Sequence, residues 1–370
     1  MEELVFGWRT ALLLILSLQL FGAAVWLALR AHERRANLYL AALLIIIIGH
    51  LTPHMIGFAG FYDRWPQLSF APFALDLAVG PLLLAYTFSL TRTRPPRTLP
   101  ALFIPAAIEL VYGLVMMVQS SETKAWWVSA VHDPFILPVE IFGGLLLAGL
   151  ALILSSQRYR AYRNWLAANS SAALEFDPRW LGGFISALTG LAVVWLVYSG
   201  ANSLFGPFAY STQYPFFLFL GLVFMGLAAG ALASHREAFP KPDGHTETQP
   251  ETPSRPDRDW ESEAAALRAR ILDEDWHLEP RLSLGQLARR MATNETYLSR
   301  AVNQGAGVNF NRFINEIRVE AVKTRLAGGA EDVLAAALEC GFNSKATFNR
   351  VFRELTGMTP AAFRADATAA

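Results

Sequence analysis

Seven apolar runs of membrane-spanning length follow one another in the first 234 residues of this 370-residue chain. A helix of about 20 such residues crosses the hydrocarbon core of a bilayer, which is about 30 Å thick. No water is present there to satisfy backbone N–H and C=O groups, so such runs span as helices. The runs cover residues 10–29, 38–61, 68–90, 99–118, 134–155, 180–205 and 213–233. The sequence therefore predicts an all-α protein that begins with a seven-transmembrane helical bundle.

The short loops between these runs differ in their content of Lys and Arg. One alternating set of loops holds ten of these residues, whereas the other set holds Arg9, Arg64 and Lys124 alone. Cytoplasmic loops of membrane proteins carry the excess of positive side chains. The sequence therefore predicts that the N-terminus lies outside the cytoplasm and that the chain after the seventh run lies inside it.

Five ionisable residues lie within the apolar runs and are the candidates for a ligand pocket: His50, His54, Asp76, Glu109 and Glu140. Ionisable groups are costly in the hydrocarbon core, so their presence indicates a function by default. An unknown small ligand or ion is the expected occupant, and hydrogen bonding between helices without a ligand is the alternative. His50 and His54 are one helical turn apart, but the glutamate of the zinc-protease helix motif is absent between them. We therefore expect no metal and no cofactor.

The composition changes abruptly after the seventh run. Residues 235–259 contain prolines among charged and small polar residues, and residues 235–280 carry 12 acidic against 6 basic side chains. A stretch of this kind buries too little apolar surface to become ordered. We predict a transmembrane domain over residues 1–234, a disordered Pro-rich acidic tether over residues 235–259 and a small all-helical domain over residues 260–370.

The clearest local pattern in the C-terminal part begins at a glycine that can end a helix. Gly341 can take the left-handed conformation of a helix C-terminus, and Asn343 or Ser344 can cap the next helix. The apolar residues of that next helix recur at helical spacing: Phe348, Val351 and Phe352. Lys, Thr, Asn and Arg side chains lie off this stripe. A short helix of this kind suits the major groove of DNA, where Arg binds guanine edges.

The same helix-turn-helix pattern occurs once before, in residues 284–291 and 295–302. Residues 310–326 lie between the two units and form a single periodic helix, which would be roughly 25 Å long. A helix of that length can hold two recognition helices in adjacent major grooves, about 34 Å apart. Residues 281–370 carry 12 basic and 8 acidic side chains, a net charge of +4 that favours a polyanionic partner.

Two further features of the C-terminal part have simple structural interpretations. The single cysteine, Cys340, excludes an intrachain disulfide and lies on the apolar side of a helix, so we expect a small core residue. Residues 260–276 are predicted to be helical with Ala264, Leu267, Ile271 and Leu272 on one side. That helix is expected to pack on the small domain, and a dimer contact is the alternative.

Residues 281–364 closely resemble the DNA-binding domain of the AraC family of bacterial transcription regulators. The resemblance covers roughly a quarter of the chain and rests on a combination of residues that a lone helix-turn-helix pattern does not supply. The matching residues are Leu284, Leu287, Ala288, Tyr297, Leu298, Ser299, Arg300, Gly307, Phe310, Ile314, Asn315, Arg318, Ala321, Gly341, Phe342, Phe348, Phe352, Gly357, Thr359, Pro360, Phe363 and Arg364.

The resemblance implies that both recognition helices touch the bases of double-stranded operator DNA in the major groove. The corresponding residues here are Thr296, Ser299, Arg300, Lys345, Ala346, Thr347 and Arg350. Ala346 departs from the usual polar type, so a hydrogen bond to a base is not expected from it. The apolar runs and the orientation of their loops, together with a bacterial family, predict the bacterial inner (cytoplasmic) membrane as the location. A homodimer and, for an activator, RNA polymerase are further expected partners.

Three functions remain open for the whole chain. The preferred hypothesis is a membrane-embedded, sequence-specific DNA-binding transcription regulator that senses an extracytoplasmic or membrane signal and is not an enzyme. The alternative is a transporter or membrane enzyme with an attached regulatory DNA-binding domain. A passive membrane anchor is the third, and it would keep normal regulation after alanine replaced all five ionisable residues in the apolar runs. A flexible tether transmits proximity rather than a rigid push, so we expect signalling through association of the membrane domains.

Overall fold

The structure is a computed structural model, and the described part of the chain consists of helices joined by loops. The described residues are 4–92, 95–206, 208–233, 239–242, 259–328 and 332–369. Within these ranges every named element is a helix, and the only β contact is an isolated antiparallel bridge between Ser170 and Ser283. The all-α fold predicted from the sequence is therefore confirmed. Most of the predicted tether, residues 235–259, lies outside the described residues.

The chain divides into two compact units. Unit 1 comprises Met1–Arg160 and Pro178–Glu247, and unit 2 comprises Ala161–Asp177 and Thr248–Ala370. Residues 161–177, which the sequence places with the membrane helices, are grouped with unit 2. Their contacts with the C-terminal domain, described below, account for this grouping.

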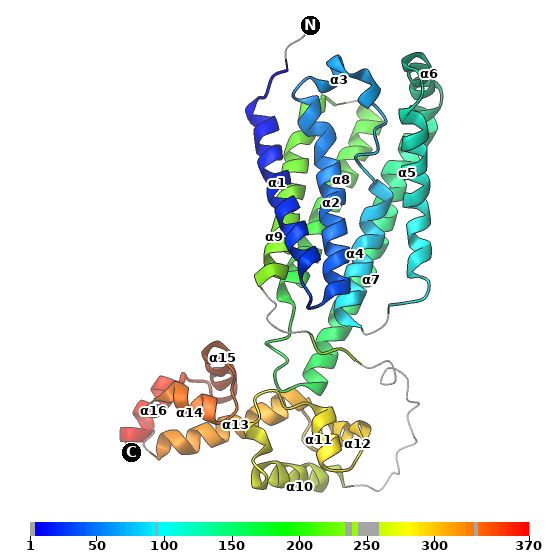
Figure 1. The fold of residues 1–370 in the computed structure, drawn as a ribbon. Coiled ribbons are helices and arrows are strands. Elements are labelled where there is room, and N and C mark those ends of the chain that lie inside the picture. Colours follow the sequence, from blue (N-terminus) through cyan, green and yellow to red (C-terminus); the bar gives the residue numbers. More distant parts are fainter. Residues whose placement is uncertain are drawn as a thin grey trace. The chain divides into compact units, whose positions relative to one another are not determined.

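Unit 1 is a bundle of long apolar helices joined by short helical turns (Figure 1). Helix α2 lies at its centre and packs against α1, α4 and α9. The elements are α1 (Trp8–Leu29), α2 (Arg34–Gly57), α3 (Phe61–Arg64), η1 (Pro66–Leu68), α4 (Asp76–Thr91), η2 (Leu99–Phe103), α5 (Ile104–Met117), α6 (Ser121–Trp127), η3 (Val128–Ile136), α7 (Leu137–Asn169), α8 (Arg179–Phe205), η4 (Tyr210–Gln213) and α9 (Tyr214–Ala233).

Among the described residues, six helical stretches are long and apolar enough to cross a membrane, and they match six of the seven predicted runs. The third run, residues 68–90, differs, because it forms the shorter helix α4 of 16 residues, which starts only at Asp76. Pro72 lacks the backbone N–H that a helix needs, and proline also disfavours the helical conformation of the residue before it. The first third of this run is therefore irregular.

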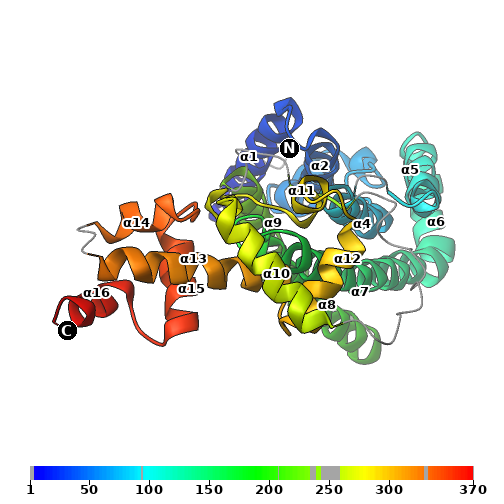
Figure 2. The ribbon, with the colours of Figure 1, turned by 90° about the horizontal axis from the view of Figure 1, so that it is seen from below.

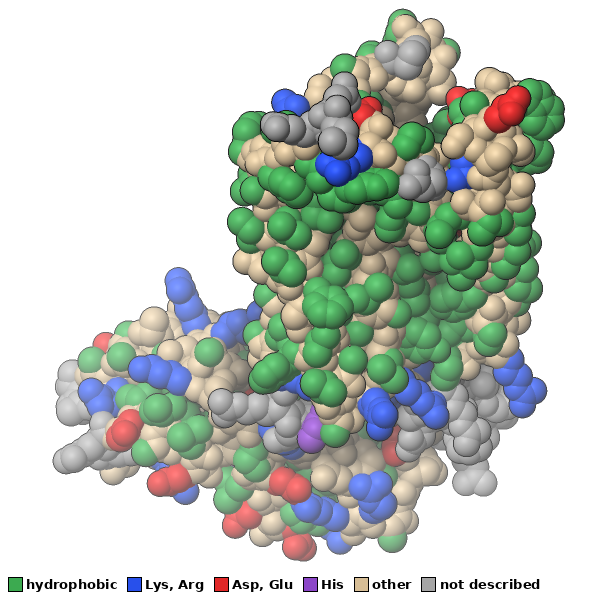
Figure 3. All heavy atoms as spheres, turned by 45° about the horizontal axis from the view of Figure 1, so that its top comes forward, with side chains coloured by type: hydrophobic (Ala, Val, Ile, Leu, Met, Phe, Trp, Pro, Cys, Tyr) green, Lys and Arg blue, Asp and Glu red, His purple; other side chains and the backbone are tan. Residues whose placement is uncertain are grey.

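The outer surface of unit 1 is apolar. Figure 3 shows hydrophobic side chains covering most of the visible face of the bundle. Among the exposed large apolar side chains are Trp26, Ile108, Leu146 and Val197. A water-exposed surface rarely carries an apolar area of this extent, whereas a lipid-facing surface requires it.

Unit 2 combines two helix-turn-helix units with a long helix, α13, between them (Figure 2). Its elements are α10 (Trp260–Asp273), η5 (Trp276–Leu278), α11 (Leu284–Arg290), α12 (Glu295–Arg300), η6 (Ala301–Gly305), α13 (Phe310–Ala327), α14 (Val333–Glu339), α15 (Lys345–Thr356) and α16 (Pro360–Ala369). Side chains at the N-termini define where several of these helices start, since Ser283, Asn294, Asn309, Asp332 and Ser344 each accept a backbone N–H bond.

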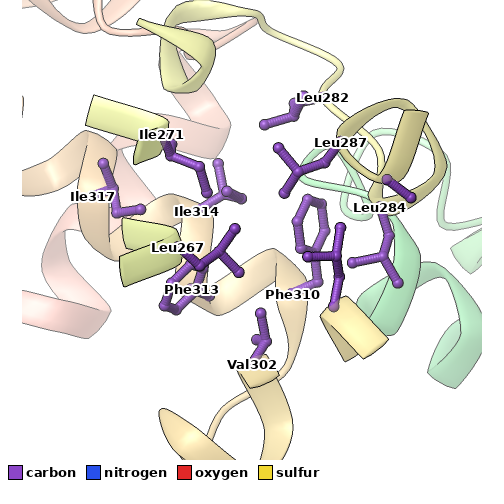
Figure 4. Packing of buried hydrophobic residues seen from close by; sticks show 12 residues of the cluster. Leu267, Ile271, Leu282, Leu284, Leu287, Val302, Phe310, Phe313, Ile314 and Ile317 are labelled. Atoms are coloured by element: carbon purple, nitrogen blue, oxygen red, sulfur yellow. The ribbon is translucent and has the colours of Figure 1, made fainter. Parts of the chain in front are cut away.

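Two hydrophobic cores hold unit 2 together, and α13 contributes to both. The first core contains Phe310, Phe313, Ile314 and Ile317 of α13 with Leu267 and Ile271 of α10 and residues of α11 and α12 (Figure 4). The second contains Val319 and Val322 of α13 with Phe348 and Phe352 of α15. Helix α10 therefore packs on the domain, as predicted, except that Leu272 is 43% exposed. Cys340 belongs to the second core, which confirms its prediction as a core residue.

Candidate DNA-binding interface and polar cluster

The second recognition helix, α15, starts and packs as its sequence predicts. Gly341 has φ +88°, the left-handed conformation that ends α14. The Ser344 hydroxyl accepts the backbone N–H of Thr347 at 3.3 Å and so caps α15. Phe348, Val351 and Phe352 are buried in the second core. The opposite side of the helix is exposed.

The exposed side of α15 carries most of the side chains expected to contact DNA. Lys345, Ala346 and Arg350 are exposed, and Thr347 is half-buried. A groove of about 950 Å³ borders the helix between α14 and α16. Four basic side chains line this groove, namely Lys345, Arg350, Arg353 and Arg364, together with the acidic Asp332 and Glu354. The surplus of positive charge suits contact with a phosphate backbone.

The first recognition helix, α12, is built in the same way. The Asn294 side chain accepts the backbone N–H of Tyr297 at 2.7 Å, and Leu298 is buried in the first core. Of the residues expected at DNA, Thr296 is exposed, whereas Ser299 and Arg300 are half-buried. Ser299 accepts a hydrogen bond from Asn303 Nδ2 at 3.1 Å, which positions its hydroxyl on the helix surface. All the predicted DNA-contacting residues thus lie on α12 or α15.

The sequence analysis names Arg318 of α13 only as a residue that matches the AraC family and gives it no structural role. It is 2% exposed, and its guanidinium donates from Nε to the His277 carbonyl at 2.8 Å and from Nη2 to the Glu279 carbonyl at 2.6 Å. Burial lowers the pKa of Arg318 to about 10, while the carboxylates of Glu175 and Glu279 act in the opposite direction, so it stays protonated at neutral pH. A basic residue among the apolar positions of a helix was the available signal.

In unit 1, three of the five candidate pocket residues form a hydrogen-bonded cluster across three helices: His50, Asp76 and Glu109. His50 Nε2 of α2 lies 2.7 Å from Asp76 Oδ1 of α4, and its Nδ1 lies 2.9 Å from the Ile46 carbonyl oxygen. A carbonyl only accepts, so Nδ1 carries a proton. The Nε2–Oδ1 contact then holds one further proton, on either the imidazole or the carboxyl group. The pair is therefore neutral overall, which suits an apolar bundle.

Glu109 of α5 joins this cluster as the cap of α4. Its carboxylate accepts the backbone N–H groups of Asp76 at 2.9 Å and Leu77 at 3.0 Å. The residue before the helix, Leu75, supplies no side-chain cap. An anionic group at a helix N-terminus satisfies unpaired donors and interacts favourably with the helix dipole. Glu109 therefore explains why α4 starts at Asp76.

The remaining two candidates do not join the hydrogen-bonded cluster. His54 stacks on Tyr210, with ring centroids 4.9 Å apart. Its ring centroid lies 3.8 Å from that of Phe217. Its Nδ1 is buried without a hydrogen-bond partner among the described residues. Glu140 of α7 is half-buried and makes no hydrogen bond or ion pair to any residue that the structure describes. The sequence thus predicted five residues in one pocket, and the structure brings three of them into direct contact.

A cavity of about 140 Å³ lies beside this cluster. His50 and Asp76 are its polar lining, and the rest is mostly apolar, contributed by α2, α4, α7, α8 and α9. Glu109, Glu140 and His54 do not line it. Sites for drug-sized ligands are typically about 300–1,000 Å³, so this cavity suits an occupant of few atoms.

Comparison with known proteins identifies the C-terminal part of the chain. A family described as a helix-turn-helix domain matches residues 287–366. An uncharacterized HTH-type transcriptional regulator of Staphylococcus aureus (strain COL) is 36% identical over 90 residues, which are 24% of this chain and 12% of that protein. The corresponding regulator of strain MSSA476 has the same identity and coverage. An uncharacterized HTH-type transcriptional regulator of Haemophilus influenzae is 31% identical over 90 residues, which are 24% of this chain and 28% of that protein.

The matching region therefore spans about an eighth of the length of the staphylococcal relatives. No solved structure matches the chain. The match places a helix-turn-helix domain at residues 287–366, within the region that resembles the AraC-type DNA-binding domain in sequence.

Proposed function

We propose that this AraC-type helix-turn-helix protein is a sequence-specific transcription regulator embedded in the bacterial inner membrane, with its DNA-binding domain in the cytoplasm. The observation that carries the proposal is the presence in one chain of two helix-turn-helix units on α13 and six long apolar stretches with exposed apolar side chains. Double-stranded DNA and the lipid bilayer are the proposed partners. Two copies would associate in the membrane, and an activator would also contact RNA polymerase.

Arg300→Ala and Arg350→Ala test the proposed DNA contacts. Each substitution is expected to weaken operator binding by roughly 1–3 kcal/mol and to relax the preference at one base pair, because Arg binds a guanine edge through two hydrogen bonds. Binding of the purified full chain to operator fragments and to their single-base variants measures both effects. Genome-wide mapping of bound DNA supplies the operators. An equal loss for all sequences would assign that arginine to phosphate instead.

Reporter fusions test the proposed orientation. A reporter that is active only in the periplasm is expected to be active after Trp65 or Trp127 and silent after Arg97 or Arg163, because the loops rich in Arg stay in the cytoplasm. Fusions at all four positions in one host strain provide the comparison. The opposite pattern would put the helix-turn-helix domain on the wrong side of the membrane for DNA and would exclude the regulator.

The sensing part of the proposal rests on the cavity beside His50 and Asp76. A shared proton, a helix N-terminus capped by Glu109 and a cavity of about 140 Å³ lie together in the apolar bundle. A small ligand or ion that pairs with the carboxyl groups or takes the proton would change the contacts between α2, α4 and α5. The variant with alanine at all five ionisable positions separates this proposal from a passive anchor, which would still regulate normally.

A transporter with an attached regulator is the second candidate, and one observation favours it. The chain before α4 is irregular within an apolar run, and broken helices with half-helix N-termini are typical of substrate sites in transporters. Uptake of solute by vesicles containing the purified protein would distinguish the two, because a regulator alone moves no solute.

A further inference from the structure

Residues 170–176, which connect α7 to α8, pack within unit 2 rather than with the bundle helices. The segment follows directly on the last residue of α7, Asn169, and α8 begins at Arg179. Ser170, Ser171, Ala172 and Ala173 are all buried. We call residues 170–176 the docking segment. Its contacts come from both halves of the DNA-binding domain.

The first half binds the backbone of the docking segment. The Ser171 N–H donates to the Leu282 carbonyl at 3.0 Å, and Ser170 and Ser283 form the antiparallel bridge. Asn311 Nδ2 of α13 donates to the carbonyl oxygens of Ser170 at 3.1 Å and Ser171 at 2.7 Å. The backbone of residues 170 and 171, at the start of a turn that runs to residue 175, is thus bound by main-chain pairing and by one side chain of α13.

The second half binds the side chains of the docking segment. Asn343, just before α15, donates to Glu175 Oε2 at 2.8 Å, and Leu174 packs against the second core. At the centre, Arg318 Nη2 donates to the Ser171 hydroxyl at 3.2 Å. The docking segment therefore bridges the entry to the first helix-turn-helix unit and the turn of the second.

The flanks of the docking segment restrict its conformation. Tyr162, Leu166 and Ala173 form a small core of their own, with Trp165 and Phe176 against it. Arg163 and Asp177 form an ion pair at 3.1 Å. The end of α7 is therefore joined to the docking segment by packed residues, not by a flexible stretch.

We propose that the docking segment is an internal peptide ligand of the DNA-binding domain and fixes the two helix-turn-helix units relative to each other. Helices α7 and α8 then control DNA binding by holding the docking segment in the domain or releasing it. Two recognition helices bind adjacent major grooves most tightly when their spacing is already fixed, because binding then needs no free energy to order the two units. The docking segment thus connects α7 and α8 directly to the DNA-binding domain, in addition to the coupling by proximity that the tether alone would give. The proposal rests on the DNA-binding half of the proposed function.

A disulfide can test whether the docking segment occupies this place in the full chain. Directly opposed residues of an antiparallel pair have Cα atoms about 4.5–5.5 Å apart, within the range that a disulfide spans. Ser170→Cys with Ser283→Cys is therefore expected to cross-link on mild oxidation of the full chain in lipid nanodiscs. The only native cysteine, Cys340, is 1% exposed and does not compete. The single variant Ser283→Cys controls for loss of the α11 cap. If no cross-link forms either in the presence or in the absence of DNA, the docking itself would be overturned.

Asn311→Ala then tests the effect of docking on DNA binding. The probe is duplex DNA selected by the full chain from a random-sequence library, and Glu320→Ala, an exposed substitution on the same helix, is the control. Asn311→Ala is expected to weaken binding about 5- to 150-fold, the usual range for coupling between sites. The affinity for a truncated duplex that offers a single major groove should fall much less.

Restoration by the cross-link excludes a simple folding defect. When Asn311→Ala is combined with Ser170→Cys and Ser283→Cys, oxidation of the two introduced thiols is expected to restore most of the affinity, whereas an unfolded domain would gain nothing. Unchanged affinity after Asn311→Ala, or no recovery on oxidation, would overturn the proposal. A gain in affinity would make docking inhibitory and would also overturn it. If the wild-type chain selects no DNA, the proposed function fails, and the cross-link yield still decides the docking.

Discussion

Arg318→Ala is expected to destabilise unit 2 by roughly 3 kcal/mol or more. The guanidinium supplies hydrogen bonds to the carbonyls of His277 and Glu279, and a third to the Ser171 hydroxyl. Alanine would leave these acceptors without their donor in a buried site, at about 1–3 kcal/mol for each unsatisfied group. It would also open a cavity beside Phe342, over whose ring the guanidinium lies at 5.9 Å.

Arg312→Ala on the same helix is the matched control. Its side chain is 53% exposed and pairs with Glu316 one turn away at 3.0 Å. Exposed pairs of this spacing contribute about 0.3–0.5 kcal/mol. Thermal or denaturant unfolding of the full chain, followed by a probe in unit 2, would measure both variants. Equal losses for Arg312→Ala and Arg318→Ala would contradict the role of Arg318 as the buried link between α13 and residues 277–279.

The recognition helices could be predicted from sequence because local interactions determine them. Helix α14 starts after Asp332, which caps it, and ends just before Gly341 with its positive φ. Ser344 likewise marks the start of α15. In both units the apolar stripe selects the buried face, so the exposed positions follow from the 3.6-residue period. The resemblance to AraC-type domains adds a prediction of which exposed positions meet DNA.

The features that sequence did not predict depend on partners distant in the chain. His50 and His54 share one face of α2, yet His50 meets Asp76 while His54 stacks on Tyr210. The start of α4 depends on Glu109, 33 positions from the N–H group of Asp76 that it caps. The docking segment is bound by Leu282, Asn311 and Arg318, which lie more than 100 positions away in the chain, so no local pattern marks it.

Gly49→Ala is expected to destabilise unit 1 by about 3 kcal/mol or more, although alanine is the better helix former. A Cβ at position 49 of α2 would lie 1.9 Å from the carbonyl oxygen of Phe73 and 3.0 Å from its carbon. The blocking atoms belong to the backbone of the irregular chain before α4, so no side-chain rotation relieves the clash. Ordinary overpacking costs about 1–3 kcal/mol. Here the shift would also disturb Asp76 and its contacts with His50 and Glu109.

Gly149→Ala of α7 is the matched control, because no atom lies within 4 Å of a Cβ added there. Removing a glycine from a helix interior without a clash is expected to stabilise by up to about 1 kcal/mol. The two substitutions are the same chemical change in the same unit, and opposite signs are expected. Thermal unfolding of both variants in detergent would measure the difference. A Gly49→Ala protein as stable as Gly149→Ala would show that the irregular chain does not lie against α2, and the cluster of His50, Asp76 and Glu109 would lose its geometric basis.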